Sequence, residues 1–420
     1  MGFSTALSGL SAAANNLAVT GNNIANANTT GFKRSRSEFA DVYATSIGGV
    51  SSIQPGAGVR VANVAQQFNQ GNLTFTENNL DLAISGEGFF TMAKNPAETN
   101  DVSYTRAGEF KLDKEGYIVN NQGNALLAYK PNGTEVSEGF SVGVLQTVQI
   151  QTLTGLPKAT DGAEIAVNLN ADNDVPVGPF NPTNNATYNN QTSVTIYDSL
   201  GSPHTLTSYF AKASSTQAQT VWNVRHYIDG TDAASDVGGG TLTFDNNGKL
   251  IDPLDGVLSL NTYTITPDTG AAPITIDSMN YFGSTQVRQA FSVNAMSQNG
   301  LPAGRLTGVD IDDEGVIFAR FSNGGSQTVG KVALTRFPNV NGLVKLGDTM
   351  WGQGANSGEP IRGEAGSNNF GGIQGGALES SNVDLAAQLV NLIVAQQTYQ
   401  ANAQTITTEN SIMQTVLNIR

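Results

Sequence analysis

The sequence predicts a mostly β protein whose two ends are α-helical and coiled-coil-like, with its domains nested inside one another. Two observations lead to this prediction. Apolar residues at both ends recur in alternating steps of three and four, which is the spacing of a coiled-coil seam. The chain between the ends shows short runs of alternating apolar and polar residues, which are typical of strands. The expected arrangement is therefore terminal helices, an inner β domain and an outer β domain within 420 residues.

The N-terminal segment combines a helical seam with a complete lack of charge. No Asp, Glu, Lys or Arg occurs from residue 1 to residue 32. The seam positions that we expect to face other helices are Phe3, Leu7, Leu10, Leu17 and Ile24. A helix with one apolar stripe and neutral side chains elsewhere is best explained by burial against other helices on most of its surface.

The C-terminal segment repeats this pattern over a greater length. Its expected seam positions are Leu385, Leu389, Leu392, Tyr399, Ile406, Met413 and Leu417. Ser381 followed by Asp384 predicts a capping box at the start of a helix of about 35 residues. We expect both ends to be largely disordered in a dilute monomer and to become helical on assembly, because little intrinsic helicity supports them alone.

A hairpin signal recurs three times in the β region, at residues 112–118, 244–250 and 311–317. Each has an Asp at the start of the turn and a Gly three positions later. The Asp can accept hydrogen bonds from the backbone ahead of it, and the Gly can adopt a positive φ. The third copy also resembles part of an EF-hand loop, but Phe321 stands where the bidentate Glu is required, so we interpret it as a turn.

Composition divides the chain into regions. The predicted domains are 1–32 with 377–420 as a terminal helical core, 33–70 and 355–376 as connecting segments, 71–147 with 287–354 as the inner β domain, and 148–286 as the outer β domain. The whole chain has a net charge of −14. Residues 148–286 hold 13 acids and 4 bases, a net charge of −9, so the acidity is concentrated in the outer block.

Several kinds of chemistry are excluded or disfavoured by composition. There is no Cys and there are only two His, so thiol catalysis is absent and zinc or His-base chemistry has little to work with. We interpret His204 and His226 as surface or hydrogen-bonded side chains, and we predict no catalytic residue, metal or cofactor. The acidic balance argues against nucleic acid as a partner, and no apolar stretch is long enough for membrane insertion. The basic cluster at residues 33–36 is either a solvated helix stop or a subunit contact.

Four groups of motifs, in order along the chain, resemble those of the bacterial flagellar rod and hook protein family. They lie at residues 16–33, 81–90, 104–110, and 381–385 with 397–402. The motif residues that we single out are Asn22, Asn23, Ile24, Ala25, Asn26, Thr30, Gly31, Phe32, Gly86, Gly88, Phe89 and Phe90. Members with an outer β domain like residues 148–286 are hook subunits, whereas distal-rod members are much shorter.

The resemblance implies a structural, non-enzymatic axial protein that polymerises with copies of itself into a helical tube. It further implies terminal helices lining the core of that tube, contacts with rod, hook-cap and hook–filament junction proteins, and extracellular placement. Export would proceed unfolded through the flagellar type III apparatus without a cleaved signal peptide. A distal-rod subunit is the alternative within the family. An extracellular glycan-binding or glycan-cleaving β protein is the alternative from another class.

Overall fold

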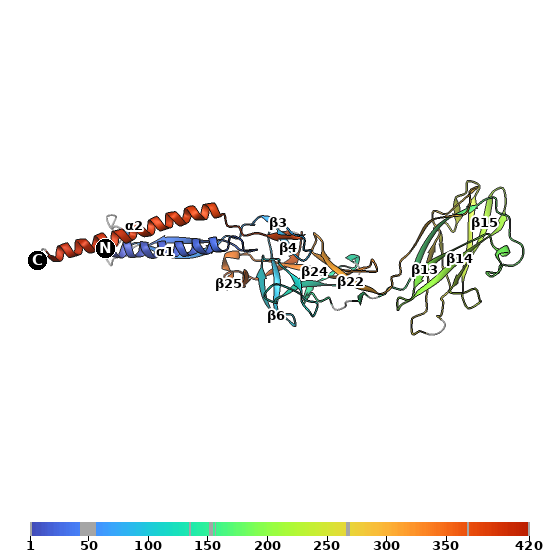
Figure 1. Cartoon of the computed structure of the whole chain (residues 1–420), viewed down its shortest axis with the longest axis horizontal. Helices are drawn as coiled ribbons and strands as arrows, with labels where there is room; N and C mark the ends of the chain where they lie inside the picture. The colour runs from blue at the N-terminus through green and yellow to red at the C-terminus, as the bar shows by residue number, and fades with distance from the viewer. Residues whose placement is uncertain are drawn as a thin grey trace. The chain divides into compact units, whose positions relative to one another are not determined.

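The structure is a computed structural model, and the residues that it describes are 2–42, 56–133, 136–150, 154–155, 157–265, 269–367 and 369–418. Residues 43–55, within the expected connecting segment 33–70, lie outside this description. The chain divides into two compact units (Figure 1). The first consists of residues 1–151, 308–319 and 327–420, and the second of residues 152–307 and 320–326.

Two long helices of the first unit lie side by side (Figure 1). They are α1 (Gly2–Ala25) and α2 (Leu385–Asn418). The 34 residues of α2 agree with the predicted length. Its predicted cap is wrong by one turn, because the Oδ1 atom of Asp384 accepts hydrogen bonds from the N–H groups of Ala386 at 2.9 Å and Ala387 at 3.1 Å. Asp384 is therefore the N-cap.

A β-hairpin flanks α1. Its strands, β1 (Ser35–Asp41) and β2 (Val59–Gln66), are antiparallel. The hydroxyl of Ser37 donates to Asn15 Oδ1 at 3.0 Å, and the N–H of Val59 donates to Ser8 Oγ at 3.2 Å. The helix is thus held by polar contacts to the hairpin as well as by α2.

The main sheet of the first unit follows the order β22-β23-β24-β9-β5-β6-β26-β25. These strands are β22 (Gly304–Ile311), β23 (Val316–Phe321), β24 (Ser326–Arg336), β9 (Ala125–Pro131), β5 (Phe89–Asn95), β6 (Glu98–Thr105), β26 (Met350–Gly352) and β25 (Val344–Gly347). Its additional strands are β10 (Phe140–Thr147), β27 (Ile361–Glu364), β7 (Lys111–Leu112) and β8 (Ile118–Val119). β22 continues across the division between the units at residue 307.

Two small sheets bring the C-terminal part of the chain beside its N-terminal part. They pair β28 (Gly372–Gly375) with β4 (Leu82–Ser85), and β29 (Ala377–Glu379) with β3 (Leu73–Phe75). The core beneath includes Leu82, Phe90, Leu126 and Val332, all fully buried. Two short 3₁₀ turns, η1 (Val136–Glu138) and η3 (Val340–Gly342), also belong to this unit.

The second unit contains two five-stranded sheets around one core. The first sheet has the order β13 (Asn190–Tyr197), β14 (Pro203–Ser215), β15 (Gln219–Ile228), β16 (Asp236–Asp245) and β17 (Leu250–Asp252). The second contains β18 (Val257–Leu258), β19 (Ser278–Asn280), β12 (Gly162–Asn170), β20 (Thr285–Val287) and β21 (Ser292–Gln298). The remaining elements are η2 (Asn185–Thr187) and β11 (Thr154–Gly155). Trp222, Phe210 and Tyr281 are fully buried in the core.

Because β20 and β21 both pair with β12, residues 287–307 belong to the second unit together with residues 152–286. The four-part division expected from the sequence otherwise stays a prediction.

The three Asp–Gly turns have the predicted geometry. The Oδ1 atoms of Asp113, Asp245 and Asp312 each accept two backbone N–H groups, two and four residues ahead. The glycines have φ angles of 83°, 78° and 79°. In the part of the chain that the structure describes, no group of three His, Cys, Asp or Glu residues could hold a metal ion.

Candidate assembly interface

The two helices meet within the chain through small and amide side chains. Asn23 Nδ2 donates to Gln388 Oε1 at 3.2 Å, and Gly9 lies against the side chain of Asn402. Because the contacts move toward the start of α1 as they move toward the end of α2, the helices are antiparallel. The helix residues that are buried are Ala6, Ala12, Ala13, Thr20, Asn23, Gln388 and Ala395. A seam of such residues allows close approach but leaves larger apolar side chains outside it.

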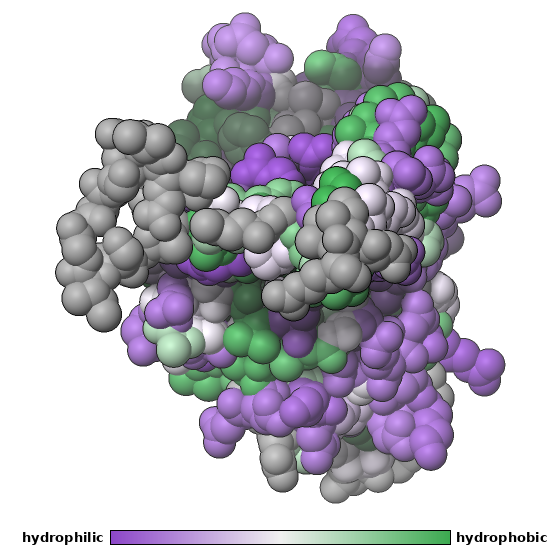
Figure 2. All heavy atoms as spheres, turned by 90° about the vertical axis from the view of Figure 1, so that its left-hand side faces the viewer, coloured by the Kyte–Doolittle hydropathy of each residue, from purple (hydrophilic) through white to green (hydrophobic). Residues whose placement is uncertain are grey.

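Most of the predicted seam positions therefore remain accessible in the single chain. Those that are exposed are Phe3, Leu7, Leu385, Leu389, Tyr399, Met413 and Leu417. Those that are partly buried are Leu10, Leu17, Ile24, Leu392 and Ile406. Leu389 keeps 50% of its surface exposed and Phe3 keeps 46%. Figure 2, which is viewed from the side on which α1 and α2 are drawn in Figure 1, shows apolar patches between polar side chains.

Further apolar residues of α2 lie outside the single predicted stripe. Val390, Ile393, Val394 and Ile412 are all more than half exposed. They lie beside the predicted positions and widen the stripe, so that α2 is apolar on several sides between residues 389 and 394. The available signal was the density of apolar residues at 389–394, where Asn391 is the one polar residue, because a helix that is apolar on several sides needs cover on several sides. Burying the exposed part of one such side chain contributes about 1 kcal/mol.

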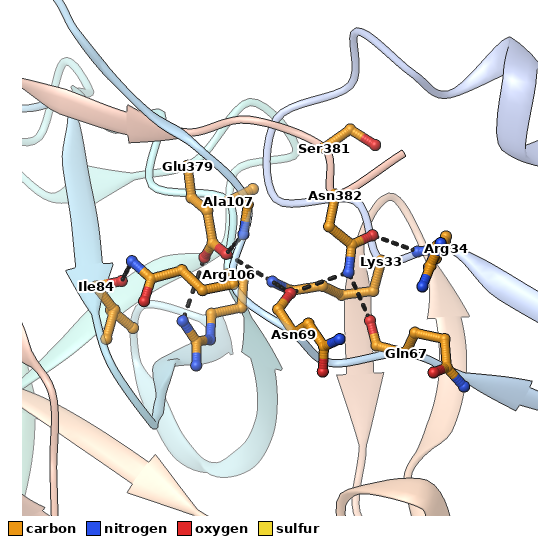
Figure 3. Close-up of polar contacts among 12 residues, drawn as sticks. Lys33, Arg34, Gln67, Asn69, Ile84, Arg106, Ala107, Glu379, Ser381 and Asn382 are labelled. Carbon is orange, nitrogen blue, oxygen red and sulfur yellow. Dashed lines mark hydrogen bonds and ion pairs between the residues drawn. The ribbon is translucent and has the colours of Figure 1, made fainter. Parts of the chain in front are cut away.

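An ionic cluster lies at the base of the helical pair, where the two ends of the chain meet the β-sheets of the first unit, which we call the β body (Figure 3). Glu379, at the end of β29, accepts hydrogen bonds from Lys33 Nζ at 2.6 Å and Arg106 Nη1 at 3.2 Å. It also accepts the N–H of Gly71 at 2.8 Å. The side chains of Glu379 and Lys33 are fully buried, and that of Arg106 is 6% exposed.

Burial dominates the electrostatics of this ionic cluster. Desolvation lowers the pKa of Lys33 and of Arg106, and in both cases the attraction of Glu379 opposes the effect. Two buried cations thus share one buried anion, so loss of Glu379 leaves both without their counter-charge. The predicted roles of residues 33–36 as a solvated stop or a subunit contact do not hold for Lys33, because it is 2% exposed and paired inside the chain.

Asn382 fastens the segment between β29 and α2 (Figure 3). Its Nδ2 atom donates to the carbonyls of Gln67 at 2.7 Å and Asn69 at 2.9 Å, and its Oδ1 atom accepts the N–H of Arg34 at 2.8 Å. The ionic cluster and this amide together connect four chain segments that are far apart in sequence. They fix where both helices leave the β body.

The other motif residues make structural contacts around the same region. Thr30 donates to Glu109 Oε1 at 2.6 Å. Gly31 has a φ of 68°, and a Cβ there would lie 2.4 Å from the backbone N of Ala107. Asn26 Nδ2 donates to the backbone carbonyl of Asn22 at 2.9 Å. Of the remaining motif residues, Ile24 and Phe32 are partly buried, Ala25 is exposed, Gly86 and Gly88 adopt positive φ, and Phe89 and Phe90 are buried.

The histidines and a hollow in the second unit give little support to enzymatic chemistry. His226 is fully buried, its Nδ1 lies 3.0 Å from Ser208 Oγ, and burial lowers its pKa to about 3. His204 contacts the carboxylates of Asp198 and Asp229. A hollow of about 510 Å³ beside β15 and β16 is lined by Phe180, Arg225 and neighbouring residues, and no carboxylate lines it. Paired-carboxylate glycan cleavage therefore has no site there.

No helix among the described residues combines the length and the apolar character that crossing a lipid bilayer requires. The helices carry their apolar residues among Asn, Gln, Ser and Thr side chains.

Four protein-family models match the chain, at both ends and in both units. They are the flagella basal body rod protein model at residues 3–33, the flagellar hook protein FlgE/F/G D1 domain at 83–172, the flagellar basal body protein FlaE D2 domain at 168–301 and the flagellar basal body rod FlgEFG protein C-terminal model at 374–419.

Similar proteins extend over the full chain. The flagellar hook proteins FlgE of Escherichia coli and Salmonella typhimurium are each 39% identical to it, over 100% of both chains. A crystal structure of the Helicobacter pylori flagellar hook protein FlgE2 superposes with a TM-score of 0.51 at 17% identity, covering 73% of this chain and 100% of that chain. At that identity the structural similarity supports the fold.

Proposed function

The chain belongs to the flagellar hook protein family and is a structural, non-enzymatic subunit of the hook, and from this premise we propose that its terminal helices are the assembly interface of a curved, flexible tube. The tube acts as a universal joint that transmits motor torque to the filament. The observation that carries the proposal is the set of large apolar side chains left exposed on two helices that have almost no charge. Exposure of such an apolar surface to water is unfavourable, and the same surface on other subunits can bury it.

Torsion is carried by the helices. Apolar packing excludes water and is dense, so it resists displacement. The intrachain seam uses small residues, which leaves Leu389, Ile393 and their neighbours free to pack against another subunit. The ionic cluster at the base of the helices couples their position to the β body in every subunit.

Bending takes place through the second unit. As the tube rotates, each subunit passes between the inside and the outside of the curve, so contacts between outer domains must exchange. This unit, residues 152–307 and 320–326, holds 13 acids and 7 bases, a net charge of −6. Contacts on such a surface are wet and screened by salt, and they exchange more readily than a packed core.

Placement and partners follow from membership of the hook. We infer an extracellular location at the flagellar hook and export of the unfolded chain through the type III apparatus without a cleaved signal peptide. Rod, hook-cap and hook–filament junction proteins are the expected neighbours at the ends of the tube. The absence of Cys suits a chain that is threaded out of the cell and held together by packing. A distal-rod subunit is disfavoured, because the hook proteins match the chain at full length.

The test compares two identical substitutions at two exposed leucines. Leu389→Asp places a charge on the proposed interface, and Leu254→Asp places one on a turn of the second unit where the leucine is 86% exposed. We expect the parental chain and Leu254→Asp to polymerise into short curved tubes in electron micrographs, and Leu389→Asp to stay soluble with unchanged melting of its β domains. Normal tubes from Leu389→Asp would refute the proposal. Loss of the β fold would instead place Leu389 in the core of the monomer.

A further inference from the structure

The register between α1 and α2 is defined by two contacts that lie two heptads apart. Asn23 bonds to Gln388, and Gly9 lies against Asn402. The interval is 14 residues on each helix, from 9 to 23 and from 388 to 402. Both contacts therefore belong to one antiparallel register that is kept along the whole of α1.

The contact between Asn23 and Gln388 is a hydrogen bond between buried amide groups. Asn23 is 2% exposed, and its amide has a complete set of partners. The Nδ2 atom donates to Ser35 O at 2.8 Å and to Gln388 Oε1 at 3.2 Å, while Oδ1 accepts the N–H of Ser35 at 2.8 Å. A buried amide that loses one of these partners has no water to replace it. The bonds to Ser35 also fix Asn23 to the hairpin that flanks α1.

The rest of the seam does not define a register by itself. Ala6, Ala13 and Thr20 recur every seven residues on α1, as do Gln388 and Ala395 on α2. Small side chains leave no large knobs or matching holes, so a slip of one heptad would present a similar surface. Such a slip would, however, bring Ala395 opposite Asn23 and leave the buried amide without its Gln388 acceptor.

The register decides which apolar surface the helical pair displays. With Asn402 beside Gly9, the last two turns of α2 extend beyond the first turn of α1. A slip of one heptad would move α2 by about 10 Å along α1. The exposed residues of α2, such as Leu389 and Met413, would then stand beside different residues of α1.

We propose that Asn23 and Gln388 are positioning residues that select one heptad register between the terminal helices, and thereby align the exposed apolar side chains of both helices into one assembly surface. The consequence for assembly rests on the proposed function. Gly9 supports the same register sterically, because a Cβ at this position would come within 2.5 Å of Asn402 Oδ1.

The absence of Cys allows the register to be read by an engineered disulfide. Asn16 lies one heptad from both Gly9 and Asn23, and Ala395 lies one heptad from both Gln388 and Asn402. Cysteines introduced by Asn16→Cys and Ala395→Cys are therefore opposite each other only in this register. Two further changes are compared in this background. Gln388→Glu keeps an oxygen acceptor for Asn23, whereas Gln388→Met keeps the length of the side chain and removes the acceptor. Each full-length chain is mixed at about one part in ten with the parental chain and polymerised, so that a variant unable to assemble alone can still be measured.

We expect equal intrachain cross-linking in the two-cysteine chain and in its Gln388→Glu variant. The Gln388→Met variant should cross-link about five-fold less or be excluded from the tubes, because only it lacks the acceptor. Equal incorporation and equal cross-linking of the Glu and Met variants would overturn the proposal. If the parental chain forms no tubes, the proposed function fails, and the same comparison in the unassembled chain, at a protein concentration where circular dichroism shows the terminal helices to be formed, tests the register independently.

Discussion

Replacing Glu379 with Gln should destabilise the first unit strongly, because it removes the only negative charge of a buried ionic cluster. The carboxylate lies 2.6 Å from Lys33 Nζ and 3.2 Å from Arg106 Nη1, and its side chain has no exposure. Glutamine has nearly the same shape as glutamate, so the substitution removes the negative charge and leaves the packing almost unchanged. Breaking a buried pair from one side typically costs about 3–5 kcal/mol.

The loss is measurable by calorimetry on the full chain. For a unit of this size we expect the melting temperature of the first unit to fall by about 10 °C, with the transition of the second unit unchanged. Glu38→Gln is the matched control, because Glu38 pairs with Arg36 on the surface, where both side chains are well exposed. That pair should contribute less than about 1 kcal/mol. Adding Lys33→Met to Glu379→Gln should restore part of the loss by removing one unpaired cation.

A fall of less than about 2 °C with Glu379→Gln would contradict a stabilising role of the buried carboxylate. It would mean that the two cations find other partners or reach water. An equal fall with Glu38→Gln would show that the effect follows from net charge and has no connection with burial.

Two other changes test other parts of the molecule. Deleting residues 1–24 should leave a folded, soluble β body that cannot polymerise, and normal tubes from this chain in electron micrographs would contradict the role of α1. For His226, burial lowers the pKa to about 3, below the value near 6.5 of an unfolded chain. The unfolded state then binds the proton more tightly, so stability should fall as the pH drops below about 6.5, by about 2 kcal/mol at pH 5. Denaturant unfolding of the second unit at pH 7 and pH 5 measures this loss, which His226→Gln should abolish; an equal loss in that variant would assign it to other groups.

The sequence pattern predicted the existence and length of the helices, but it did not predict which face of each helix is buried within the chain. Large apolar residues at a/d spacing indicate that a helix is covered, and the pattern is the same whether the cover is the same chain or another copy. Within the chain, the cover uses Ala13, Thr20 and Ala395, which carry little hydrophobic signal. Leu389 and Ile393 remain exposed in the single chain, and we propose that other subunits cover them.

The ionic cluster was missed for a similar reason. Lys33 stands in a short basic run that looks solvated, and its partner Glu379 is 346 residues away in the sequence. Only the pairing of β29 with β3 brings Glu379 to that place. The Asp–Gly turns were predictable because each is determined by residues within one local segment, such as Asp113 and Gly116.

In the assembly that we propose, neighbouring subunits cover the exposed apolar side chains of α1 and α2. Electron cryomicroscopy of tubes polymerised from the pure chain tests it most directly, at a resolution that shows side chains. We predict a short curved tube in which Phe3, Leu7, Leu389 and Ile393 are buried against helices of other subunits and the second units meet through polar contacts. Tubes in which these four side chains face solvent, with subunits joined only through their β domains, would contradict an assembly interface on the terminal helices.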